Sequence, residues 1–123
     1  MDEYRYFRGM IIILLRLFSG LSHLAYGILA LTMAFYIEEF VRYGFADLRI
    51  AIAVAQILGG AGLLLFKFSP RTSAISACLL AIMMAGALAT RVSIQDSLEK
   101  SLPALIYLLI NSFIFMKSLN NFK

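Results

Sequence analysis

Apolar residues fill long stretches of this chain, and four of these stretches have the length of a membrane crossing. A helix needs roughly 17–25 mostly apolar residues to cross a hydrocarbon core of about 30 Å. The four runs lie at residues 10–36, 50–68, 72–90 and 102–116. The pattern therefore predicts an all-α bundle of four transmembrane helices, folded as one domain over residues 1–123. A lipid bilayer is the first partner that it implies.

Serine and proline mark where two of these helices should begin. Ser69 and Pro70 suit the N-cap and the first helical position, so the second and third helices are expected to form a tight hairpin. Pro103 is expected in the first turn of the fourth helix for the same reason.

Composition and charge support the membrane interpretation. Of 123 residues, 62% are hydrophobic and 15% charged, whereas a soluble domain has about 25% charged residues. The eleven Lys and Arg residues are scattered between the apolar runs, which favours a membrane-flanking role and not nucleic-acid binding. Cys78 is the single cysteine and is expected to pack in the interior. There is no Cys/His zinc spacing, so no metal is expected.

Basic residues predict the direction of the helices. The side that holds both termini and the second connection has six of them, and the other side has four. They are Arg5, Arg8, Lys67, Arg71, Lys117 and Lys123 against Arg42, Arg49, Arg91 and Lys100. Because positive loops stay in the cytoplasm, both termini are predicted there. We expect a multi-pass protein of the cell membrane, and specifically of the bacterial cytoplasmic membrane.

The first helix has a polar and small-residue stripe. Its members recur at steps of three and four: Arg16, Ser19, Gly20, His23, Gly27 and Ala30. Small residues allow close helix contact and polar ones need partners within a bundle, so the stripe should face inward. Arg16 is interpreted either as snorkelling or structurally paired, or as functional. His23 is interpreted either as hydrogen-bonded to a neighbouring helix or as part of a site.

Counting 1.5 Å per residue places four polar side chains at a similar depth in the outer half of the membrane. They are His23, Gln56, Tyr107 and Asn111, from three helices. One interpretation is interhelical hydrogen bonding that fixes the packing. The other is a polar pocket within apolar walls, open toward the outer leaflet, which would suit a quinone-like or lipid-like ligand.

Glycines are concentrated in the first two helices. Gly20, Gly27, Gly59 and Gly60 are predicted to be helix-packing positions. The run AQILGGAG is not interpreted as a phosphate loop, because no strand precedes it and no lysine-serine pair follows.

From about residue 15 to 116 the chain resembles the DoxX and DoxX-like family of small four-helix membrane proteins. The resemblance rests on Arg16 followed by Gly27, the Tyr43-Gly44 turn, the glycine-rich QILGGAGLLL and the basic hairpin SPRTSA. Family members look like membrane subunits of quinone-linked sulfur oxidation or oxidant-resistance complexes, and some eukaryotic ones like chaperones or cargo receptors.

The chain departs from the family pattern at three places. Ala30 stands where the family often has lysine, Gln56 where an acidic residue is usual, and Thr90 or Arg91 where a histidine occurs. If the family's lysine and glutamate form a buried charge pair, this chain has lost both together and keeps a neutral site, whereas loss of one alone would strand a buried charge.

Three functions follow as hypotheses. The first is a non-catalytic membrane subunit or scaffold that binds a protein partner or a second copy of itself, because no nucleophile–base or metal constellation is present. The second is a quinone-interacting subunit of an oxidoreductase. The third is a small-molecule transporter, for which an intramembrane carboxylate is missing. An enzyme that acts on its own is not expected.

Overall fold

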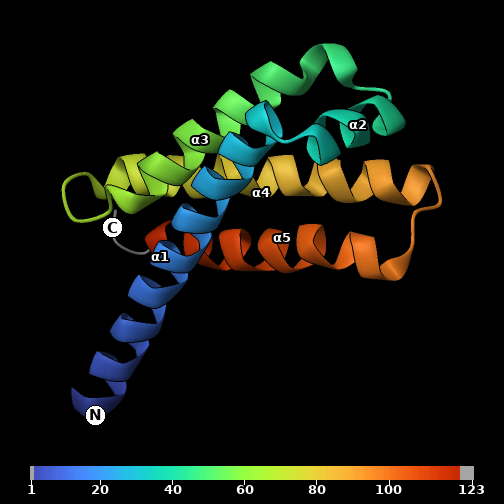
Figure 1. Ribbon diagram of the computed structural model, residues 1–123. Helices are drawn as coiled ribbons and strands as arrows, with labels where there is room; N and C mark the ends of the chain where they lie inside the picture. The colour runs from blue at the N-terminus through green and yellow to red at the C-terminus, as the bar shows by residue number, and fades with distance from the viewer. Residues whose placement is uncertain (1, 120–123) are drawn as a thin grey trace.

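The computed structural model describes residues 2–119, which form five α-helices and one short 3-10 helix (Figure 1). They are α1 (Asp2–Thr32), α2 (Ala34–Tyr43), η1 (Ala46–Leu48), α3 (Arg49–Leu64), α4 (Pro70–Ser93) and α5 (Leu98–Leu119). No strand occurs in the described part of the chain, which confirms the all-α class. Four segments are long and apolar enough to cross a bilayer: Glu3–Thr32, Ala46–Leu64, Pro70–Ser93 and Leu98–Leu119. The four predicted crossings are all present.

The first apolar run is not one helix. The sequence predicts a helix over residues 10–36, but α1 starts earlier and ends at Thr32, and α2 follows as a separate helix. The side chain of Arg49 accounts for this end, because its Nη1 donates to the carbonyl oxygens of Ala30 at 2.8 Å and Leu31 at 3.3 Å. The last carbonyls of a helix lack partners within it, and a basic side chain can supply them.

A glycine turn ends α2. Gly44 has a φ of +84°, a left-handed conformation that favours glycine because it has no Cβ. The N–H of Phe45 then reaches back to the carbonyl oxygen of Phe40 at 2.9 Å, which closes the helix end. The chain turns here into η1 and α3.

In the hairpin of α3 and α4, the second helix, α4, starts where the sequence predicts. The Oγ atom of Ser69 accepts a hydrogen bond from the N–H of Thr72 at 3.3 Å, and Pro70 is the first residue of α4. For α5 the expectation was wrong. Ser97 is its N-cap, with Oγ accepting from the N–H of Lys100 at 3.2 Å, so Pro103 lies in the second turn and not the first.

The long helices form two packed pairs. α1 packs along α3 and α4 along α5, and α3 joins the pairs through its contact with α4. Figure 1 shows the two pairs crossing, with the N-terminal part of α1 extending beyond the other helices. The connection at residues 65–69 and the end of α5 lie at one end of the bundle, which we call the hairpin end (Figure 1). α2, η1 and the connection at residues 94–97 lie at the other end, the α2 end.

The hairpin half of the bundle contains an apolar core. Leu63, Ala77, Leu80 and Ile114 are fully buried there and pack together from α3, α4 and α5. Leucine and isoleucine also cover much of the outside of the bundle. An apolar outside is expected where acyl chains are the solvent. The polar and small-residue stripe of α1 is turned inward: Arg16, Ser19, Gly20, His23, Gly27 and Ala30 are all buried.

Glycines bring α1 and α3 together. A Cβ atom added to Gly60 would lie 2.6 Å from the carbonyl oxygen of Gly20, and one added to Gly27 would lie 2.8 Å from the carbonyl oxygen of Ala53. A Cβ on Gly59 would lie 2.7 Å from the side chain of Leu80 on α4. Each glycine thus faces a neighbouring helix at a distance that a side chain would not allow.

Candidate functional site

A cavity of about 530 Å³ occupies the α2 half of the bundle. All five α-helices and η1 contribute to its wall, which is mostly apolar and rich in aromatic side chains. α2 supplies one face of residues, Phe35, Tyr36, Glu39, Phe40 and Tyr43, which line the cavity at the spacing of one helix side. The apolar core of the hairpin half and this cavity therefore lie in opposite halves of the same bundle.

His23 of α1 lines the cavity and forms a hydrogen bond with Asn111 of α5. Its Nε2 atom lies 3.1 Å from Nδ2 of Asn111, and Oδ1 of the same amide accepts from Oγ of Ser19 at 2.5 Å. Because the amide nitrogen can only donate, Nε2 accepts, and the neutral imidazole carries its proton on Nδ1. The hydrogen bonds from α1 and α5 thus select one tautomer of the ring.

Two polar atoms beside the cavity have no partner. Nδ1 of His23 and Oε1 of Gln56 are both buried, and neither has a hydrogen-bond partner among residues 2–119. A buried donor or acceptor left unpaired costs about 1–3 kcal/mol. The site therefore offers one donor and one acceptor within apolar surroundings, and an unpaired group of this kind calls for an explanation.

Aromatic rings pack around Tyr107 next to His23. Tyr107 is buried and lies at the centre of three ring contacts, stacked on Phe18 with centroids 5.7 Å apart and edge-on to His23 at 5.1 Å and Tyr26 at 6.0 Å. Ring pairs at such distances have favourable quadrupole geometry. The imidazole is therefore fixed by ring packing as well as by hydrogen bonds.

The four residues that the depth count groups together have different positions. His23, Gln56 and Tyr107 line the cavity. Asn111 is fully buried and does not line the cavity. Its side-chain amide forms hydrogen bonds with both His23 and Ser19. The positions at which the chain departs from the DoxX pattern, Ala30, Gln56, Thr90 and Arg91, all line the same cavity.

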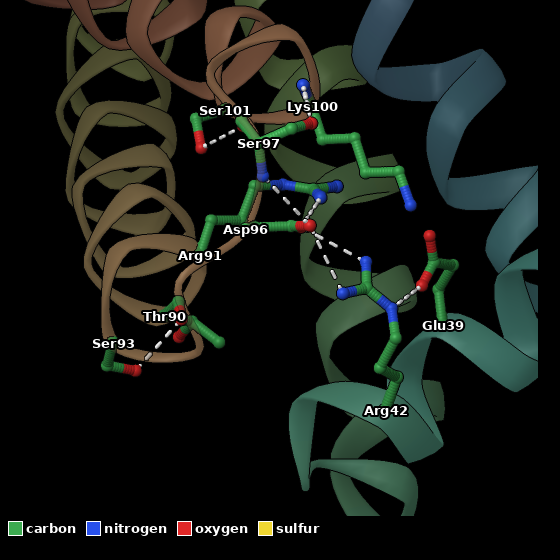
Figure 2. A network of polar contacts seen from close by, with 9 residues as sticks. All are labelled: Glu39, Arg42, Thr90, Arg91, Ser93, Asp96, Ser97, Lys100 and Ser101. Atoms are coloured by element: carbon green, nitrogen blue, oxygen red, sulfur yellow. Dashed lines mark hydrogen bonds and ion pairs between the residues drawn. The ribbon is translucent and has the colours of Figure 1, made fainter.

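An ionic cluster at the α2 end was not expected from the sequence. Nε of Arg42 lies 2.5 Å from a carboxylate oxygen of Glu39, and its two terminal nitrogens bind Asp96 at 3.2 and 3.1 Å. Asp96 also accepts from Arg91 at 2.7 Å, as Figure 2 shows. The cluster therefore joins α2 to the α4–α5 connection. Two of its members, Glu39 and Arg91, line the cavity together with the nearby Lys100.

The cluster shifts the pKa values of its members. Hydrogen bonds from Arg42 and Arg91 lower the pKa of Asp96 from 3.8 to about 2, with Arg42 as the larger cause. The hydrogen bond from Arg42 likewise lowers the pKa of Glu39, and both carboxylates raise the pKa of Arg42. Burial raises the pKa of Tyr43, whose ring lies under both guanidinium groups at 5.2 and 5.0 Å. Glu39, Arg42 and Asp96 are therefore all ionised at neutral pH.

Only part of this cluster leaves a sequence signal. Glu39 and Arg42 are three residues apart, which is a spacing for contact on a helix face. The pairing with Asp96 crosses 54 residues of sequence and depends on how α2 folds back over the bundle.

Arg16 lies away from the cavity, at the hairpin end. It is 8% exposed; its Nη2 donates to Oγ of Ser118 at 2.9 Å, and its guanidinium carbon lies 5.3 Å from the ring centroid of Phe66. Nε is buried without a partner in the described part of the chain. Arg16 and His23 share one stripe of α1 but belong to separate environments.

No cluster of three or more His, Cys, Asp or Glu side chains that could hold a metal ion occurs among residues 2–119. Cys78 is half-buried on α4.

Four apolar crossings around a cavity with a few polar groups define a multi-pass helical membrane protein. The chain belongs to the DoxX-like family, whose model matches residues 9–114. Comparison with curated proteins and with solved structures found no significant match.

Proposed function

We propose that this DoxX-like membrane protein binds an amphipathic small molecule of the quinone class in the cavity of its α2 half. The observation that carries the proposal is the pair of buried, unpartnered polar atoms, Nδ1 of His23 and Oε1 of Gln56, at a largely apolar cavity. A head group with one acceptor and one donor would satisfy both atoms. A partly reduced or hydroxylated quinone head group has both.

Size and surroundings support this ligand class. Small-molecule sites are concave, mostly apolar and about 300–1,000 Å³ in volume, with few convergent polar groups. The cavity of about 530 Å³ falls within that range. Tyr26, Phe40 and Tyr107 line it and offer flat apolar surface to a planar ring.

A ligand-binding role is compatible with the subunit or scaffold function that the sequence suggests. The cavity lies inside the bundle, whereas a protein partner would bind the outer helix faces, which carry exposed residues such as Leu21, Leu58 and Ile82. The scaffold function stays a prediction, as does the identity of the membrane.

Binding of a short-chain quinone by the purified protein tests the proposal. The protein in mild detergent is titrated with decylubiquinone, and affinity is measured by thermal shift and by direct binding. We expect Gln56→Leu to bind about two- to tenfold more weakly, because one hydrogen bond is worth about 0.5–1.5 kcal/mol and tenfold is about 1.4 kcal/mol.

The matched control is Ser73→Ala. Ser73 is a fully buried polar residue of the hairpin half, whose Oγ donates to the carbonyl oxygen of Leu63 at 3.0 Å, and it does not line the cavity. Its substitution is expected to lower stability and leave quinone affinity unchanged. Equal affinities of the wild type and Gln56→Leu, with both proteins folded, would contradict the proposal.

A further inference from the structure

The guanidinium group of Arg16 is a buried charge that forms no salt bridge with a carboxylate side chain of residues 3–119. Its guanidinium group donates to the hydroxyl of Ser118 and lies over the ring of Phe66, and neither group carries a negative charge. Ser118 donates its own proton to the carbonyl oxygen of Ile114 at 2.7 Å, so the hydroxyl brings no negative charge. Buried charges in proteins are normally paired.

The distribution of acidic residues makes an internal partner remote. Five of the seven acids of the chain, Glu38, Glu39, Asp47, Asp96 and Glu99, lie at the α2 end or in the first turn of α5. The other two are residues 2 and 3, which precede Arg16 on α1 by thirteen or more residues, about 20 Å along a helix.

Arg16 lies at the level where two membrane-spanning helices end. Ser118 belongs to the last turn of α5, and Phe66 to the connection just after α3. The chain neighbour of each contact is basic: Lys117 precedes Ser118 and Lys67 follows Phe66. Ends of spanning helices meet the lipid head groups, and basic groups at this level attract anionic lipids.

We propose that Arg16, held in place by Ser118, binds the phosphate group of an anionic phospholipid at the hairpin end of the bundle. The planar guanidinium group has five N–H donors, and Ser118 uses one of them. Phosphate oxygens match the remaining donors bidentately, which lysine cannot do. The basic residues Lys67 and Lys117 add long-range attraction for the negative head group. This site is independent of the proposed cavity ligand.

Lipid binding by arginine variants in mild detergent tests the proposal. The purified protein is titrated with dioleoyl phosphatidylglycerol or, separately, dioleoyl phosphatidylcholine, and bound lipids are counted by native mass spectrometry. We expect Arg16→Met to bind phosphatidylglycerol at least tenfold more weakly than the wild type and phosphatidylcholine equally. Arg16→Lys, which keeps the charge but not the fork, should fall between the two.

Arg8→Gln is the matched control. Arg8 lies on the same helix toward the same terminus, but it is exposed and its guanidinium group lies over the ring of Tyr4. The Arg8→Gln protein should keep nearly all of the phosphatidylglycerol binding of the wild type. Equal loss in Arg8→Gln and Arg16→Met would mean only general attraction by surface charge and would overturn the proposal.

Thermal stability gives a second measurement that separates lipid binding from a purely structural role. Without anionic lipid, Arg16→Met should melt at or above the wild-type temperature, because it removes a buried charge without an anionic partner. With phosphatidylglycerol the wild type should gain several degrees and Arg16→Met none. If Arg16→Met is destabilised equally with and without phosphatidylglycerol, Arg16 is structural and the proposal fails. If inorganic phosphate alone reproduces the wild-type gain and phosphatidylglycerol does not, the lipid assignment fails.

Discussion

Replacing Gly60 by alanine tests how closely α1 and α3 pack. The added Cβ would lie 2.6 Å from the carbonyl oxygen of Gly20 and 3.0 Å from the backbone nitrogen of Leu24. Both atoms belong to the backbone of α1, so no side-chain rotation can relieve the contact. Ordinary contact begins at 3.4 Å, and α1 must therefore move away from α3 by about 0.8 Å.

The size of the effect follows from two opposing terms. Alanine in place of glycine within a helix stabilises by roughly 0.5–1 kcal/mol. Overpacking a close contact costs about 1–3 kcal/mol, since a gap of 0.5–1 Å already removes about a quarter to a half of each van der Waals attraction across the interface. Packing contributes much of helix association in lipid. We therefore expect Gly60→Ala to lower the free energy of unfolding by about 1–2 kcal/mol.

Gly86 supplies the control, because a Cβ added there meets no atom within 4 Å. Gly86→Ala should be neutral or more stable by up to about 1 kcal/mol. Unfolding of both variants by sodium dodecyl sulfate in mixed micelles, followed by far-UV circular dichroism, gives the comparison. If Gly60→Ala proves as stable as Gly86→Ala, α1 and α3 do not approach each other as described.

Three further predictions concern the helix ends and the ionic cluster. Gln95 has a left-handed φ of +56°, a conformation that glycine adopts more easily. Gln95→Gly should therefore raise the free energy of unfolding by about 0.5–1 kcal/mol, measured by thermal melting with circular dichroism. An unchanged or lower melting temperature would contradict this. Ser69→Ala removes the N-cap of α4 and should cost about 1 kcal/mol in the same assay, whereas Ser69→Asp, which can also cap, should retain most of it. The Asp96 carboxylate has a pKa of about 2 against an ordinary 3.8, so its ion pairs stabilise the protein above pH 4 and this contribution is lost as pH falls toward 2. A pH series of melting temperatures should therefore be flatter between pH 4 and pH 2 for Asp96→Asn than for the wild type, and parallel curves would refute the pairing.

Features that depend on local sequence are predicted well in this protein. Span length and apolar content predict the four crossings, and the Ser69–Pro70 signal correctly marks the start of α4. The periodicity of α1 correctly indicates which face is buried, because helix geometry alone decides which residues share a side.

Features that depend on distant residues could not be predicted in the same way. The end of α1 at Thr32 depends on Arg49, which lies 19 residues beyond Ala30, and the apolar run itself continues past it. Pro103 was misplaced because Ser97, a weaker signal outside the apolar run, caps α5. The pairing of Arg42 with Asp96 exists only because α2 folds back against the α4–α5 connection.

The cavity shows the same limit at the candidate site. A depth count brings His23, Gln56 and Tyr107 to one level of the membrane, and in the structure all three line the same cavity. Periodicity and depth do not say whether the space between such residues is filled or hollow. That depends on which side chains of all the helices reach inward, and here α2, which the sequence analysis did not separate from α1, closes one side.

The nitrogen-15 spectrum of His23 tests the central claim most directly. His23 is the only histidine of the chain, so selective labelling yields a single imidazole whose two ring nitrogens can be assigned. We predict that the proton resides on Nδ1 in the free protein and that the Nδ1 signal shifts on saturation with decylubiquinone while Nε2, bound to Asn111, changes less. A proton on Nε2, or a ring spectrum unchanged at saturating quinone, would contradict the account.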